Sequence, residues 1–125
     1  MTNAKHTAFA AALTKAYAAA DAAQAGKVED TRSLNCGFAW VVVHDRAFMT
    51  WCRKQIEQEK LRLCMGYTRA TRRYGDKHHA AGWCFWKPGS FSGQQVDIHL
   101  AGAVAFSDTL AHELQIRCEV GSRLD

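Results

Sequence analysis

Lysine and arginine side chains gather in the middle of the chain, with aromatic side chains close to them in sequence. Residues 53–87 hold nine Lys or Arg and three acidic residues, a net charge of +6 in a chain whose formal charge is +4. Such cations gain salt-sensitive affinity for phosphate groups by releasing condensed counterions, and neighbouring aromatic rings offer surfaces on which bases stack. The pattern predicts an anionic ligand, a nucleotide or nucleic acid, bound by Arg69, Arg72, Arg73, Lys77, Trp83, Gln94 and Arg123.

Gln94 and Arg123 enter this set from the second half of the chain. Gln94 lies in the loop 89–97, just before a predicted helix whose first amide groups attract anions. Arg123 carries a planar guanidinium that suits a carboxylate or a phosphate. Other interpretations stay open: the basic segment as a solvated surface, and Arg123 either in a structural ion pair with Asp97 or Asp125 or in a frayed tail.

The cysteines predict free thiols. Five cysteines are an odd number and form no C-x-x-C pair, which disfavours a secreted disulfide framework. Cys36, Cys84 and Cys118 fall in three predicted strands and could meet, with a histidine, at a zinc ion. Structural zinc sites usually have closely spaced ligand pairs, which these cysteines lack. We therefore expect no metal and no other cofactor.

Motifs of catalysis are missing from the sequence. It contains no G-x-S-x-G, P-loop or H-E-x-x-H pattern. Its cysteines and histidines show no spacing that pairs a nucleophile with a base, and Asp97 and Asp125 are acids without a visible partner. The sequence therefore favours binding over catalysis and names no catalytic residue. An enzyme acting on a nucleotide is the least favoured alternative, and it would depend on Asp97 or Cys36.

Length and composition indicate one globular domain. The chain has 125 residues, of which 48% are hydrophobic and 22% charged, as in ordinary folded proteins. The longest apolar run, residues 38–43, is far shorter than the roughly 18 residues that cross a bilayer. The N-terminal stretch lacks a compact secretory apolar core. We expect a cytoplasmic protein with no membrane partner, and the oligomeric state stays open.

An alanine-rich helix is predicted at the N-terminus. Residues 4–25 contain neither Gly nor Pro and place apolar side chains at helical spacing: Phe9, Leu13, Tyr17 and Ala20. Gly26 is expected to end this helix with a left-handed cap. We divide the chain into residues 1–34, the loosely attached helix and its connecting loop, and residues 35–125, the main fold with a basic insert at about 60–81.

Strand and helix patterns alternate in the main fold. Aromatic and β-branched content predicts strands over residues 36–43, 82–87 and 116–120. Asp45 is expected to cap a helix that runs to about Lys60. A weaker pattern predicts a short edge strand at Leu61, Leu63 and Met65 and then a basic loop.

The last predicted helix covers residues 98–114, with a predicted buried side formed by Leu100, Ala103, Val104, Ser107, Leu110 and Ala111. Trp83 and Trp86 lie three positions apart in a predicted strand, so they should face opposite sides of the sheet. Trp40 and Trp51 are expected in the core. The order of elements predicts an α+β fold, or a small α/β fold, with a three- or four-stranded sheet packed by two or three helices.

Several short strings resemble a family of small uncharacterised proteins of bacteriophages and prophages. The resemblance covers about residues 35–125 and rests on Cys36-Gly-Phe-Ala-Trp-Val41, Phe48 with Trp51, Trp86, Gly93-Gln94 with Asp97, Ala101-Gly-Ala103 with Ala105-Phe106, and Ser122-Arg-Leu-Asp125. It implies a phage accessory protein in the cytoplasm of a bacterial host, and it implies no activity. The basic insert at 60–81 is particular to this sequence.

These observations together predict a small phage accessory protein that acts by binding an anionic ligand. An alternative is a protein-interaction inhibitor of a host defence or of other host machinery, in which exposed aromatic side chains matter more than charge. Binding to a polyanion weakens steeply as salt is added, whereas a protein complex of that kind persists.

Overall fold

Four ranges of the chain, residues 3–30, 35–57, 70–71 and 82–124, are described by the computed structural model. Over these residues the elements follow in the order α1 (Asn3–Asp30), β1 (Gly37–Val43), α2 (Arg46–Glu57), β2 (Ala70–Thr71), β3 (Trp83–Trp86), α4 (Val96–Leu114) and β4 (Cys118–Leu124).

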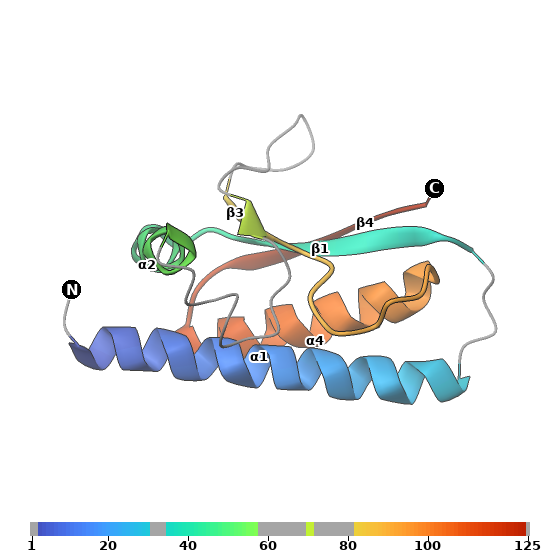
Figure 1. The fold of residues 1–125 in the computed structure, drawn as a ribbon. Helices are drawn as coiled ribbons and strands as arrows, with labels where there is room; N and C mark the ends of the chain where they lie inside the picture. The colour runs from blue at the N-terminus through green and yellow to red at the C-terminus, as the bar shows by residue number, and fades with distance from the viewer. Residues whose placement is uncertain (1–2, 31–34, 58–69, 72–81, 125) are drawn as a thin grey trace.

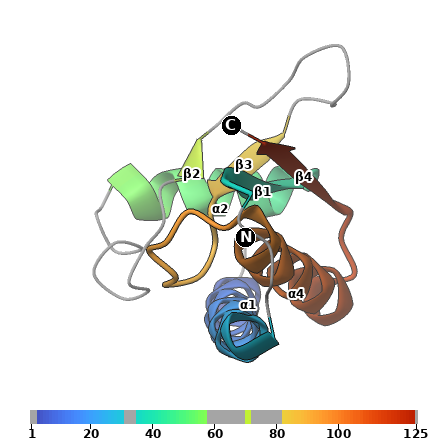
Figure 2. The ribbon, with the colours of Figure 1, turned by 90° about the vertical axis from the view of Figure 1, so that its right-hand side faces the viewer.

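One antiparallel sheet organises the described residues, with the strand order β2-β3-β1-β4. Helices α1 and α4 run side by side in opposite directions along one face of this sheet (Figure 1, Figure 2). An antiparallel sheet with its long helices on one face is an α+β arrangement. The predicted α+β class is therefore confirmed.

Strand β1 is apolar on both sides because it occupies the centre of the sheet. Ala39, Val41 and Val43 point toward the helices and are buried with residues of α1 and α4. Trp40 and Val42 point to the opposite face, where they form a second buried cluster. A strand covered on both faces gives a continuous apolar run rather than an alternating one, as the sequence of β1 does.

Helix α2 begins where the sequence predicts it. The Asp45 Oδ2 atom accepts a hydrogen bond of 2.9 Å from the Phe48 N–H, which satisfies one of the free amide groups at the helix start. The side chains of Phe48, Trp51 and Cys52 are buried in the main core, as their spacing predicts. The predicted core positions of Trp40 and Trp51 are confirmed.

Helix α1 differs from its prediction in two ways. It continues through Gly26 to Asp30, so the predicted cap at Gly26 is wrong. It also packs closely along α4 and buries Phe9, Leu13 and Tyr17, so the predicted loose attachment is wrong as well. A glycine inside a helix costs only roughly 1 kcal/mol relative to alanine, which is not enough to end a helix of this length.

Helix α4 and strand β4 also depart from their predicted limits. Ala103, Ser107 and Leu110 are buried as expected, but Leu100 is 36% and Val104 42% exposed, which contradicts their predicted burial. They are exposed although they continue the apolar stripe, because β4 is the last strand on that side of the sheet. Strand β4 runs to Leu124, so residues 121–124, beyond the predicted end of this strand at 120, belong to the sheet, and the alternative of a frayed tail at Arg123 is wrong.

The predicted strand at Leu61, Leu63 and Met65 lies outside the described residues, and so does most of the basic insert. Within the described ranges, no helix combines the length and the apolar content needed to cross a membrane.

A buried glutamine joins α1 to the loop between β3 and α4. Gln24 is 3% exposed, and its Nε2 atom donates to the Pro88 carbonyl at 3.2 Å while its Oε1 atom accepts from the Phe91 N–H at 3.1 Å. A Cβ atom at Gly89 or Gly102 would lie within 2.4 Å of this side chain, and Gly89 has a φ of +115°. Both glycines therefore make room for Gln24, which holds the loop in place.

We predict that Gln24→Ala lowers the free energy of unfolding by about 1–3 kcal/mol, because two buried backbone groups lose their partner. Urea denaturation monitored by tryptophan fluorescence measures the change. Gln94→Ala, at an exposed glutamine, is the control and should change stability by less than about 0.5 kcal/mol. Equal stability of the two variants would show that Gln24 does not hold the loop.

Candidate ligand-binding site

The candidate site lies on the face of the sheet that α1 and α4 leave uncovered, near the start of β1. Antiparallel pairing places Trp86 of β3 opposite Trp40, and Arg123 of β4 opposite Phe38. Directly paired residues project to the same side of a sheet. Phe38, Trp40, Trp86 and Arg123 therefore share this face.

Three aromatic rings form a row here. The Trp40 and Trp86 rings are stacked, with centroids 5.5 Å apart and an interplanar angle of 12°. The Phe38 ring lies 5.4 Å from the Trp86 ring at 40°. Trp40 is buried, whereas Phe38 and Trp86 are half-buried. The accessible end of the row is thus made by Phe38 and Trp86, which we call the aromatic platform.

A lysine places a positive charge on this platform. The Lys87 Nζ atom lies 5.4 Å from the centroid of the Phe38 ring, within the range of a cation–π interaction. Its backbone is held where β3 ends, because the Lys87 N–H donates to the Ala39 carbonyl at 3.0 Å and its φ is +50°. The Lys87 ammonium group is therefore adjacent to a flat ring.

The loop before α4 joins the same end of β1. The Gly37 N–H donates to the Gln94 carbonyl at 2.9 Å, and the Val96 N–H donates to the Asn35 carbonyl at 3.0 Å. The Cys36 thiol donates to Gln94 Oε1 at 3.5 Å, and both side chains are exposed. Gln94 therefore lies beside the first residues of β1.

His99 lies behind the aromatic platform. Its side chain is fully buried, with its ring 6.3 Å from Phe38 and 5.2 Å from Phe91. Burial lowers the pKa of His99, and the nearby Lys87 charge lowers it further, while the 2.8 Å contact of Nε2 with the Gly93 carbonyl acts in the opposite direction. A neutral ring that donates from Nε2 fits these surroundings. Its Nδ1 atom has no hydrogen-bond partner within the described part of the chain.

The structure brings together two of the residues predicted to bind a ligand. Gln94 is bonded to Gly37, and Arg123 is paired with the next residue, Phe38. Trp83 is not part of this group: it is 3% exposed, lies on the helix side of the sheet and pairs with Val43. The other four predicted residues lie outside the described ranges: Arg69, Arg72, Arg73 and Lys77.

Phe38, Trp86 and Lys87 are absent from the predicted set. Part of the signal was present in the sequence, because Trp83 and Trp86 were expected on opposite faces and do lie there. Phe38 stands two residues before Trp40 in the same strand and so shares its face. What the sequence did not give is which of the two faces the helices cover.

The described cysteines differ in their surroundings. Cys36 donates to an amide oxygen, which cannot remove the thiol proton, so this contact does not activate the sulfur. Burial raises the pKa of Cys118 to about 11, and burial also raises the pKa of Cys52. The four cysteines in the described ranges are free thiols, and those ranges contain no cluster of three or more metal-ligating side chains.

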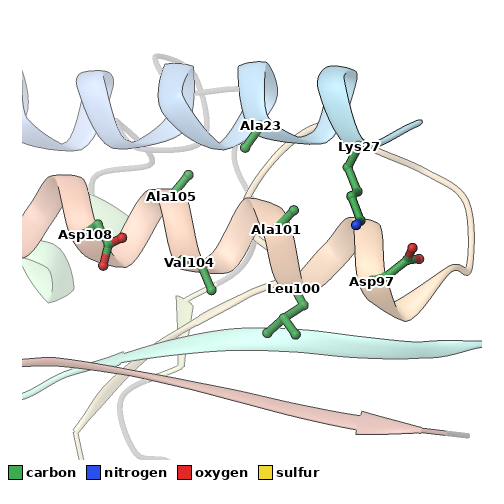
Figure 3. A pocket seen from close by; sticks show the side chains of 8 residues that line it. All are labelled: Ala23, Lys27, Asp97, Leu100, Ala101, Val104, Ala105 and Asp108. Atoms are coloured by element: carbon green, nitrogen blue, oxygen red, sulfur yellow. The ribbon is translucent and has the colours of Figure 1, made fainter. Parts of the chain in front are cut away.

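A groove of about 530 Å³ lies elsewhere, along the outer surface of the helix pair (Figure 3). It runs between Ala23 and Lys27 of α1 and the part of α4 from Asp97 to Asp108. Its lining combines apolar side chains, Leu100 and Val104 among them, with charged ones. This groove differs from the aromatic platform because no aromatic side chain lines it.

Comparisons of this chain with protein-family models, with curated proteins and with solved structures gave no match.

We predict that His99 makes the protein less stable in mild acid. The folded state holds the pKa of His99 below the ordinary value of about 6.5, so below that pH the unfolded chain takes up a proton that the folded chain does not. Stability is therefore lost as the pH falls from neutrality through the unfolded-state value toward the folded-state value. His99→Gln should reduce this loss.

Urea denaturation of both proteins at about pH 7.5 and about pH 5.5 measures the difference. The comparison uses the change between the two pH values, so a general destabilisation by the substitution cancels. His112→Gln, at an exposed position of the same helix, is the control for removing a histidine. An equal pH-dependent loss in the wild type and in His99→Gln would contradict the assignment.

Proposed function

We propose that this protein is a small phage-encoded accessory protein that works in the cytoplasm of the bacterial host by binding an anionic ligand with flat rings, a nucleotide or single-stranded nucleic acid. The observation that carries the proposal is the aromatic platform of Phe38 and Trp86 with the Lys87 ammonium group 5.4 Å from the Phe38 ring. Bases stack on such rings whatever their sequence.

Charge on the same face supports an anionic ligand. Lys87 stands beside the platform, and the exposed Arg123 is paired with Phe38. In the sequence, residues 53–87 add a net charge of +6, and we expect Arg69, Arg72, Arg73 and Lys77 to contribute further phosphate contacts. A base stacked on Trp86 would leave its phosphate near Lys87, whose Nζ atom lies 5.4 Å from the neighbouring Phe38 ring.

The geometry favours binding over turnover. The platform offers rings and cations, which hold a nucleotide, whereas the thiol nearest to it is bonded to an amide oxygen. Stacking and phosphate contacts are tolerant of sequence. We therefore expect similar affinity for oligonucleotides of different sequence and a steep decrease of affinity with salt.

We predict that Trp86→Leu weakens binding of a fluorescein-labelled oligothymidylate by roughly tenfold or more, since loss of one stacking ring costs about 1–3 kcal/mol per base. Lys87→Asn should weaken binding at low salt and reduce its salt dependence, because one phosphate contact is lost. Asparagine tolerates the positive φ at this position, so the backbone is kept. Fluorescence anisotropy over a series of salt concentrations measures both effects.

Lys5→Asn is the matched control, because Lys5 is an exposed lysine on α1, outside residues 53–87 and in the helix layer on the other face of the sheet. Adenosine and guanosine nucleotides are tested by competition with the labelled oligonucleotide. If neither nucleotides nor oligonucleotides bind at low salt, the proposal is wrong. Retention of a host protein at high salt would then favour the alternative, an inhibitor of host defence or of other host machinery that acts through protein contacts.

A further inference from the structure

Strand β4 forms one edge of the sheet, and its outer side is open in the described part of the chain. Its only strand neighbour there is β1. The His44 N–H donates to the Arg117 carbonyl at 3.0 Å, which fixes the hydrogen-bonding phase of the β1–β4 ladder. Backbone groups alternate in direction along a strand. Glu119, Gly121 and Arg123 thus point their N–H and C=O groups toward β1, and the residues between them point outward.

Natural proteins protect such edges with charged side chains, most often lysine, with proline or with a bulge. The two charged residues of β4, Glu119 and Arg123, are of opposite sign, so they can pair with each other between two copies. Strand β4 has neither lysine nor proline, and its pairing with β1 is continuous from Cys118 to Leu124, so no bulge interrupts it. Its seven residues form a long, regular edge. This edge is a template for pairing with another strand.

We propose that β4 pairs antiparallel with β4 of a second copy of this chain, about a two-fold axis at Gly121. This register places Glu119 of each copy opposite Arg123 of the other, which gives two opposite-charge pairs. The axis passes through Gly121, whose missing side chain makes room for the Trp40 ring of the same chain. Val120 then lies opposite Ser122 of the second copy.

The hydrogen-bonding phase agrees with this register. The outward-pointing residues Val120 and Ser122 face each other and exchange backbone hydrogen bonds across the new pair of strands. Glu119 and Arg123 occupy the alternate pairs without hydrogen bonds, in which side chains approach most closely. A register shifted by one residue would place residues whose N–H and C=O groups point outward opposite residues whose groups point toward β1. The backbone hydrogen bonds between the two strands would then be lost. A shift by two that moves the axis to Val120 would place Arg117 opposite Arg123, two like charges.

The Glu119 carboxylate can accept a further hydrogen bond from Arg123 of a second copy. Its carboxylate already accepts from Arg117 at 2.7 Å and contacts His44 Nε2 at 3.0 Å, and it remains partly exposed. These contacts lower its pKa, so the side chain is ionised at neutral pH. A carboxylate has about four acceptor positions, which leaves room for a guanidinium of the second copy.

Apolar side chains beside the edge support the same partner. The Ser107 hydroxyl bonds the Cys118 thiol, so this face of α4 points toward β4. Leu100 and Val104 lie seven and three residues earlier on that face, and Leu124, on the helix side of β4, is 61% exposed. The two-fold pairing places the α4 helices of the two copies near each other, on the same side of the joined sheets. It therefore covers the side chains that the single chain leaves exposed.

Charge reversal tests the register without any ligand. Arg123→Glu alone opposes two pairs of glutamates, and Glu119→Arg alone opposes two pairs of arginines, so each variant should weaken the dimer by roughly tenfold or more. An equimolar mixture of the two variants should restore it, because both pairs are complementary in the mixed dimer. Sedimentation equilibrium of the full chain measures the association. Lys54→Glu, on α2, controls for the change in charge.

A second variant tests the backbone contact. Ser122→Pro removes an outward N–H while the bonds to β1 remain, so it should yield a folded monomer. Ser122→Thr keeps the N–H and should still dimerise. A wild-type chain that is monomeric at every concentration tested overturns the proposal, as does a mixture of charge variants that stays monomeric. Because no nucleotide is present, these outcomes are independent of the proposed ligand-binding function.

Discussion

The central strand β1 must be covered on both faces, and the rest of the structure follows from this requirement. Its residues are apolar in succession, so neither side can meet water without cost. Helices α1 and α4 cover Ala39, Val41 and Val43, and the aromatic cluster with Trp86 lies over Trp40. The strands β3 and β4 then take the two sides of β1. The two proposed binding surfaces, the aromatic platform and the edge of β4, lie at the margins of this packing.

Local pattern predicted the elements that have strong local signals. The aromatic and β-branched run of β1, the Asp45 cap and the long apolar stripe of α4 all depend on residues close in sequence. The alternation of side chains also placed Trp83 and Trp86 on opposite faces. In each case the deciding interaction spans only a few residues, so one sequence contained enough information.

Features that depend on distant segments could not be predicted in the same way. The exposure of Leu100 and Val104 is decided by strand order, because no described strand follows β4 on that side. The end of α1 could not be placed from its glycine alone, because the roughly 1 kcal/mol that Gly26 costs does not stop a long helix. Arg123 lies in β4, beyond the predicted end of the strand, because its backbone pairs with β1 and this pairing does not require an apolar side chain. Its place opposite Phe38 is therefore a property of the topology.

The two proposed surfaces meet at β4. A two-fold axis perpendicular to a sheet keeps the same face on the same side in both copies. Paired through β4, the two sheets would present both aromatic platforms on one continuous face, with the helices of both copies behind it. Such a face would have cations and rings repeated along its length, because Lys87 and Trp86 occur once in each copy. It would suit the proposed single-stranded nucleic acid better than one mononucleotide, since a strand could contact both platforms at once and gain affinity from the second contact.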